Sequence, residues 1–235
     1  MSKIQSKNEW LQKRRKKRDI KMSIAIILMI AILIFSIFLF GKLLFRFLGP
    51  GENDTEAITE TLSNGTVIQQ HYLTPNEFSR PQTKLKRVKG VVIHYTANPG
   101  TSAKANRSYF EGLASKHTTY ASSHYIVGLE GEVLQCIPLT EIAYASNNRN
   151  EDTISIECCH LDETGEFDDK TYDSLVALVA ALSIKFNLKE EDIIRHYDVT
   201  GKLCPLYYVE HEEAWVTLKA VIENEIILIK SIVEE

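Results

Sequence analysis

The sequence predicts a single α/β domain, with a central mixed β-sheet flanked by helices, preceded by one transmembrane helix. Three observations support this prediction. Apolar runs typical of strands, such as residues 91–93, alternate along residues 67–235 with segments of helical periodicity. The length of that part suits one hydrophobic core. A separate run of 19 residues, 22–40, contains no charged side chain.

The uncharged run 22–40 is long enough to cross a membrane, because a helix of this length extends about 28 Å. Nine Lys or Arg and two Asp or Glu occupy residues 1–21. Positive flanks stay inside, so we expect a basic cytoplasmic tail at 1–21 and an extracytoplasmic domain after the anchor. A cleaved signal peptide is the alternative, but it needs a shorter apolar core. A buried core helix is seldom apolar on every face.

A polar stretch with Gly and Pro follows the predicted anchor, and we interpret residues 41–66 as a tether that leads to the domain at 67–235. Residues 51–235 contain 16 basic and 29 acidic side chains, a net charge of −13. Such an acidic domain argues against nucleic acid as a partner. The basic tail is explained as a topology signal that also contacts anionic lipid at the cell membrane.

Five segments of the domain have the character of strands, and three have that of helices. The strands are expected where apolar residues are consecutive or alternate, at 88–95, 123–127, 132–137, 153–159 and 193–194. Apolar residues spaced three or four apart predict amphipathic helices at 172–186 and 212–232, and residues 103–116 also have the composition of a helix. Because strands and helices interleave, we expect helices to cover the sheet.

Two histidines and one cysteine are candidate metal ligands. His94 ends an apolar run, and His196 follows residues 193–195 at the end of another. Cys204 comes eight residues after His196, with Gly201 between them to turn the chain back. Two imidazoles and a thiolate are enough to hold Zn²⁺ with one open coordination position. The alternatives are a satisfied core histidine at 94 and a buried cysteine near a surface histidine.

Two charged residues are candidates for catalysis beside such a metal. Glu157 interrupts the apolar strand 153–159, where a charge seldom lies without a partner or a function. A carboxylate next to a metal is a natural proton acceptor, although Glu157 could equally face solvent from an edge strand. Lys202 lies two residues before Cys204 and could stabilise an oxyanion, or be an ordinary surface lysine.

The remaining cysteines do not form a disulfide scaffold. The chain contains four cysteines, at positions 136, 158, 159 and 204, which is too few for a disulfide-rich fold. If Cys204 binds metal, at least one of the other three is unpaired. Buried reduced thiols are the favoured interpretation for Cys158 and Cys159, while a bond from Cys136 to one of them stays open.

Several separated motifs, in order from Tyr72 to Trp215, resemble the zinc-dependent N-acetylmuramoyl-L-alanine amidases of the type-2 amidase family. That family is related to peptidoglycan recognition proteins and to phage endolysin amidases. The matching segments are Leu-Thr-Pro-Asn-Glu-Phe-Ser-Arg-Pro at 73–81, Val-Val-Ile-His-Tyr-Thr-Ala-Asn-Pro-Gly-Thr at 91–101, Ser-Ser-His-Tyr-Ile-Val at 122–127, Thr-Ile-Ser-Ile-Glu at 153–157, and the loop 196–205.

The resemblance implies a role for each candidate residue. It implies zinc ligands at His94, His196 and Cys204, Glu157 as the general base and acid, and Lys202 as the oxyanion stabiliser. We also expect the side chain of His124 to face the cleft and to contact substrate.

The chain departs from parts of the family at two places. Ser occupies position 123, where one branch has an active-site tyrosine, and together with Glu157 this resembles the endolysin-type branch. Ile142-Ala143-Tyr144-Ala145 stands where many relatives have a Trp-His pair, so a substrate contact of that histidine is not carried over.

The resemblance predicts a zinc hydrolase that cleaves the amide bond between N-acetylmuramic acid and L-alanine in peptidoglycan, and the run 22–40 predicts that it is anchored in the membrane. Its cofactor would be Zn²⁺, and the catalytic domain would lie on the outer side of the cell membrane. A non-catalytic peptidoglycan-binding receptor of the same fold is the alternative, and a zinc peptidase acting on the stem peptide is a third hypothesis. Because all three candidate ligands, Glu157 and Lys202 are present, the sequence favours the enzyme. The oligomeric state stays open.

Overall fold

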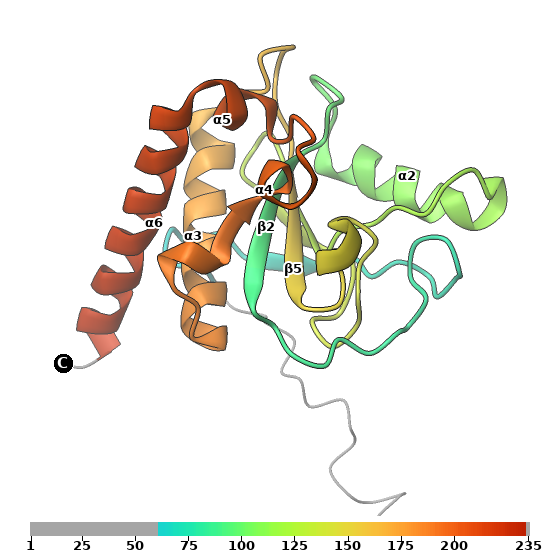
Figure 1. Ribbon diagram of the computed structural model, residues 1–235, viewed down its shortest axis with the longest axis horizontal. Coiled ribbons are helices and arrows are strands. Elements are labelled where there is room, and N and C mark those ends of the chain that lie inside the picture. Colours follow the sequence, from blue (N-terminus) through green and yellow to red (C-terminus); the bar gives the residue numbers. More distant parts are fainter. Residues whose placement is uncertain (1–60, 234–235) are drawn as a thin grey trace, which may run out of the picture. The chain divides into compact units, whose positions relative to one another are not determined.

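The computed structural model describes residues 61–233 (Figure 1). The predicted cytoplasmic tail at 1–21, the predicted anchor at 22–40 and most of the predicted tether lie outside these residues. None of the helices within 61–233 combines the length and apolarity that a membrane span requires. All four cysteines are buried and free of disulfide bonds, which resolves the pairing that the sequence left open.

One sheet of six strands forms the centre of the domain. In chain order the strands are β1 (Ile68–Gln70), β2 (Gly90–Tyr95), β3 (Tyr125–Val127), β4 (Val133–Gln135), β5 (Thr153–Cys158) and β6 (Ile193–Arg195). Their spatial order is β1-β4-β3-β5-β2-β6. Only β3 and β4 pair antiparallel, and the other neighbours are parallel. The predicted mixed sheet is therefore confirmed.

Helices cover both faces of this sheet (Figure 1). The long helices are α2 (Ala103–Lys116), α3 (Asp169–Phe186) and α6 (Glu212–Val233), and the short ones are α4 (His196–Thr200), α5 (Leu206–Glu210) and the 3₁₀ turns η1 (Asn147–Arg149) and η2 (Glu190–Asp192). α3 and α6 lie side by side and pack on one face, while α2 contacts β3 and β4 from the other.

Alternation along the strands divides the core into two clusters. Val91 and Ile93 of β2 and Ile154 and Ile156 of β5 join the cluster that includes the buried side chains of α3 and α6. Ile126 belongs instead to the cluster under α2. Because successive side chains of a strand point to opposite faces, the even-numbered positions of β2 and the odd-numbered positions of β5 face away from α3 and α6.

The folded domain begins upstream of the predicted boundary at 67. Leu62 is only 4% exposed and belongs to the main core cluster. Thr61 forms an antiparallel bridge with Val67, and the Asn64 side-chain amide donates a hydrogen bond to the Ser174 hydroxyl. Residues 61–66 are thus part of the fold, although their polar composition resembled a tether.

Candidate metal centre

The candidate residues gather where three neighbouring parallel strands end. His94 is the second-last residue of β2, and it lies opposite Glu157 of β5 in the register of the two strands. On the other side of β2, Ile93 pairs with Arg195 of β6, and His196 follows as the first residue of α4. The carboxyl ends of parallel strands meet at one edge of a sheet, which is where open α/β sheets place their ligands.

A tight loop returns the cysteine to this edge. Gly201 ends α4 with a positive φ of 77°, which glycine adopts without steric cost. The Tyr197 amide then donates a hydrogen bond of 2.9 Å to the Cys204 carbonyl, which closes the loop. As a result, the Cys204 Sγ lies 3.8 Å from Nδ1 of His94.

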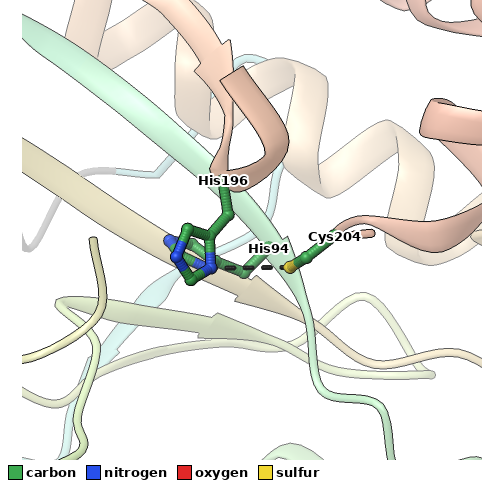
Figure 2. A group of neighbouring side chains, drawn as sticks. All are labelled: His94, His196 and Cys204. Carbon is green, nitrogen blue, oxygen red and sulfur yellow. Dashed lines mark hydrogen bonds between the residues drawn. The ribbon is translucent and has the colours of Figure 1, made fainter. Parts of the chain in front are cut away.

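The two imidazoles and the thiol converge on one point (Figure 2). Their ligand atoms all lie within 4.8 Å of one another, and the ring centroids of His94 and His196 are 4.7 Å apart. The three side chains are buried, at 2%, 7% and 2% exposure for His94, His196 and Cys204. Nδ1 of His196 is buried and has no hydrogen-bond partner within residues 61–233.

This donor set fits a metal ion. A buried imidazole nitrogen without a partner is costly unless something binds it, and two nitrogens with one sulfur suit Zn²⁺. Burial, followed by the positive charge of Lys202, lowers the pKa of His196. Burial likewise holds the pKa of His94 well below its usual value, with His196 and Lys202 adding to the effect. Both rings are therefore neutral at pH 7, the form that binds metals.

Two residues that the sequence analysis did not single out contact the Nε2 nitrogens of the histidines. Nε2 of His94 lies 3.2 Å from the Ser146 hydroxyl, and Nε2 of His196 lies 3.1 Å from Oδ1 of Asn147. No local signal in the sequence pointed to them, because a polar stretch before a strand has the composition of any surface loop. Ser146 and Asn147 reach the histidines only because the loop before β5 passes over this edge of the sheet.

Glu157 lies beside the candidate metal ligands in an environment that favours the protonated carboxyl. Burial raises its pKa to about 8, and the Lys202 ammonium opposes that rise. One carboxylate oxygen, Oε2, is buried without a hydrogen-bond partner in the described part of the chain. Because paired positions of parallel strands point to the same face, the side chains of Glu157 and His94 lie on the same side of the sheet.

Lys202 is exposed at the rim of the site. Its ammonium is close enough to influence the pKa of His94, His196 and Glu157. Among residues 61–233 it forms no salt bridge, so its charge is not neutralised by a neighbouring carboxylate.

The structure corrects the expectation that His124 faces the cleft. Its side chain is 1% exposed, with Nδ1 3.1 Å from the Ser155 hydroxyl and Nε2 3.0 Å from the Glu141 carbonyl oxygen. Both ring nitrogens are therefore engaged within the protein. Because burial lowers the pKa of His124 to about 4, the imidazole is neutral and links β3, β5 and residue 141.

The departures at positions 123 and 144–145 also have a structural basis. Ser123 is fully buried, and its hydroxyl donates a 2.7 Å hydrogen bond to the Tyr125 carbonyl. Tyr144 packs edge-on against Tyr120, with ring centroids 5.5 Å apart. Both tyrosines line an open pocket of about 210 Å³, together with Ala145, Asn147 and Asn150. Since Asn147 contacts His196, this pocket adjoins the metal centre.

Curated proteins similar to this chain come from Bacillus. The chain is 34% identical over 170 residues to the N-acetylmuramoyl-L-alanine amidase CwlL of Bacillus licheniformis, covering 67% of this chain and 47% of that one. It is 35% identical over 175 residues to the N-acetylmuramoyl-L-alanine amidase BlyA of Bacillus subtilis strain 168, covering 66% and 46%. The chain thus spans less than half the length of these relatives.

Solved structures share the fold over nearly their whole length. A mutant endolysin from Bacillus subtilis superposes with a TM-score of 0.57 at 26% identity, over 67% of this chain and 99% of that chain. The solution structure of the PlyG catalytic domain gives the same TM-score and identity, over 68% and 95%. Residues 84–206 match the Amidase_2 family, described as N-acetylmuramoyl-L-alanine amidase. Because this match covers more than half of the sequence and contains the whole metal centre, the chain belongs to that family.

Proposed function

We propose that this chain is a zinc-dependent N-acetylmuramoyl-L-alanine amidase, anchored in the cell membrane, that hydrolyses peptidoglycan. One observation carries the proposal: His94, His196 and Cys204 converge beside an unpartnered, buried Glu157 oxygen. Membership of the amidase family and relatives named for this activity support the choice of bond. A non-catalytic receptor would need neither the open ligand set nor a carboxylate next to it.

The three ligands would hold Zn²⁺ with one coordination position open. When bound, the ion would supply a Lewis acid and make water acidic enough to lose a proton near pH 7. Metal binding would also require the Cys204 thiolate, whereas burial raises the pKa of the metal-free thiol to about 12. Zinc binding should therefore release this proton.

Glu157 would move the proton through the reaction. Its carboxylate accepts a proton from the water that attacks the lactyl carbonyl carbon of N-acetylmuramic acid. As the carbon–nitrogen bond breaks, the carboxyl donates that proton to the departing amine of L-alanine. A general acid and base works best when its pKa is near the working pH. Burial raises the pKa of Glu157 to about 8, and the positive charge of a bound Zn²⁺ would lower it again.

Lys202 would stabilise the negative charge that develops on the carbonyl oxygen during the attack. Its ammonium is free of salt bridges within the described residues and lies at the rim of the site. Loss of one oxyanion donor costs about 10²–10³ in rate. Lys202→Ala should slow turnover to that extent while Lys202→Arg retains much of it; an undiminished rate in Lys202→Ala would rule out this role.

The proposed reaction is tested by determining which bond of peptidoglycan is cut. The full chain, purified in mild detergent, is incubated with isolated peptidoglycan, and the soluble products are analysed by mass spectrometry. An amidase releases stem peptides with a free L-alanine amino group and leaves glycan strands without peptide. Release of shorter peptides would identify a peptidase, and binding without any release would identify a receptor.

The membrane anchor rests on the sequence of residues 1–40, and its orientation on the excess of Lys and Arg before residue 22. Protease added to intact protoplasts should remove the domain and leave the tail protected. Protection of the domain with loss of the tail would reverse the proposed topology.

A further inference from the structure

Two consecutive residues contact the two metal-ligating histidines, one each. The Ser146 hydroxyl lies 3.2 Å from Nε2 of His94, and Oδ1 of Asn147 lies 3.1 Å from Nε2 of His196. In both histidines the engaged nitrogen is therefore Nε2. Nδ1 of His94 instead lies 3.8 Å from Cys204 Sγ, and Nδ1 of His196 has no partner among residues 61–233.

The contact with Asn147 determines which nitrogen of His196 carries the hydrogen. An amide oxygen can only accept, so Nε2 of His196 must be the donor. The neutral ring then has its lone pair on Nδ1, the buried nitrogen that has no partner among residues 61–233 and is free to bind a metal. A single side-chain oxygen thereby fixes both the tautomer and the rotation of the ring before any metal binds.

Ser146 plays a related part for His94. Its side chain is 1% exposed, so water does not compete for the hydroxyl. A hydroxyl can accept from a ring N–H or donate to a bare ring nitrogen, so Ser146 holds the rotation of the His94 ring, whose Nδ1 lies 3.8 Å from Cys204 Sγ.

The backbone around the pair is held in an unusual conformation. Asn147 has a positive φ of 52°, which is unfavourable for residues with a Cβ and least so for Asn. Oδ1 of Asn150 accepts hydrogen bonds from the backbone amides of Ala145 and Ser146, at 3.1 and 2.6 Å. Backbone strain of this kind persists where the surrounding contacts over-determine the structure, and it concentrates at functional sites.

We propose that Ser146 and Asn147 are positioning residues that hold the orientation of both ligating histidines, with Asn147 also setting the tautomer of His196, so that the metal site is organised before the metal binds. This inference rests on the proposed metal centre and extends it by two residues. It explains why a strained Asn follows a fully buried Ser at this point of the chain. Partners of this kind typically contribute 10–100-fold to metal affinity.

The test measures Zn²⁺ affinity of the full chain by competition with a chromophoric chelator. Asn147→Gly removes the amide but keeps the backbone conformation, and Ser146→Ala removes the hydroxyl. Each should weaken Zn²⁺ binding by about 10–100-fold. Asn147→Asp keeps an acceptor oxygen at the same place, so it should bind Zn²⁺ at least as tightly as the wild type.

Matched controls separate positioning from a general effect of the substitution. Asn187 has the same backbone conformation, with φ of 53°, but ends α3 away from the site. Ser183 is a buried serine of α3 whose hydroxyl has no partner in the described residues. Asn187→Gly and Ser183→Ala should leave Zn²⁺ affinity unchanged.

Two further measurements, the melting temperature and the absorption spectrum of the Co²⁺ derivative, distinguish the possible outcomes. The metal-free Asn147→Gly protein should melt no lower than the wild type, since glycine relieves the strained φ, and its Co²⁺ derivative should show an altered absorption spectrum. Wild-type affinity in both Ser146→Ala and Asn147→Gly would overturn this inference alone. Absence of stoichiometric Zn²⁺ binding by the wild type would overturn the proposed function as well.

Discussion

We expect the protonation state of Glu157 and the residues around it to matter more for activity than Glu157 matters for folding. It follows Ile156 on a strand whose alternate residues are core, yet one of its oxygens is buried without a partner in the described part of the chain. Burial and the opposing charge of Lys202 together place its pKa at about 8. Removing the carboxylate should therefore affect proton transfer rather than metal binding.

Glu157→Gln tests this separation directly. We expect the rate of peptide release to fall by about 10²–10⁴, the usual contribution of a positioned general acid and base, while the zinc content stays at the wild-type level. Both are measured on the same preparation. Near-normal release by the variant would remove Glu157 from the mechanism, and loss of zinc would make it a structural part of the centre.

The sequence predicted the three side chains that converge at the candidate metal centre but not the residues that surround them. His94, His196 and Cys204 could be proposed because their residue types suit zinc and because Gly201 allows the chain to turn. The expectation that the His124 side chain faces the cleft was wrong. The sequence does not distinguish a histidine that faces the cleft from one that is buried against Ser155. Ser146 and Asn147 were missed because their contacts with the ligands are 52 and 49 residues away in the chain.

Among the elements, α3 shows how a helix start is specified by one side chain. Oδ1 of Asp168 accepts hydrogen bonds from the backbone amides of Lys170 and Thr171. The apolar periodicity predicts this helix only from residue 172, because the periodic pattern becomes visible after the first turn. The capping residue explains the three additional residues.

Asp168→Ala should lower the free energy of unfolding by about 1 kcal/mol, the usual loss when an N-cap acceptor is removed. Urea denaturation of the full chain, followed by circular dichroism, gives the comparison. Asp168→Asn retains an acceptor and should lose much less. Equal losses in the two variants would show that the charge of Asp168, and not its capping contact, stabilises α3.

The long helices were predictable, whereas β1, α4 and α5 were missed. The equally short β3, β4 and β6 were predicted because each contains consecutive or alternating apolar residues. α2 was predicted with its observed bounds, and α6 to within one residue at its end. In contrast, β1, α4 and α5 have three to five residues each, which is too short for a periodic pattern to emerge. α4 begins where the Asp198 carboxylate accepts a hydrogen bond from the Arg195 backbone amide, a contact that composition does not reveal.

For the molecule as a whole, the order of the strands determines where the chemistry lies. β5, β2 and β6 are neighbours although they are far apart in sequence, and this adjacency brings Glu157, His94 and His196 to one edge. The sequence indicated strands ending in functional residues, but strand order depends on long-range pairing that no local pattern encodes. The face opposite α3 and α6 receives the polar residues of β5, Thr153, Ser155 and Glu157.

The stability of the domain should depend on pH through His124. Burial lowers its pKa from 6.5 to about 4 in the folded state, so the unfolded chain binds more protons between these values. Stability is therefore full above pH 6.5 and is lost as the pH falls toward 4. The contribution of this single group to that loss is about 3 kcal/mol.

His124→Gln cannot titrate, so its stability should fall less steeply between pH 7 and 4 than that of the wild type. Urea denaturation at a series of pH values measures both slopes, and contributions from other groups cancel in the difference. Identical slopes would mean that the buried imidazole does not resist protonation as its contacts suggest.

If the proposed function is right, one Zn²⁺ bound by His94, His196 and Cys204 enables the chain to cut the amide. The most direct measurement titrates Zn²⁺ into the metal-stripped full chain and records bound zinc and newly formed L-alanine amino groups in the same samples. Release should rise in proportion to bound zinc, level off at one ion per chain, and be absent from Cys204→Ser. Full release from the metal-stripped chain, or undiminished release by Cys204→Ser, would contradict the account.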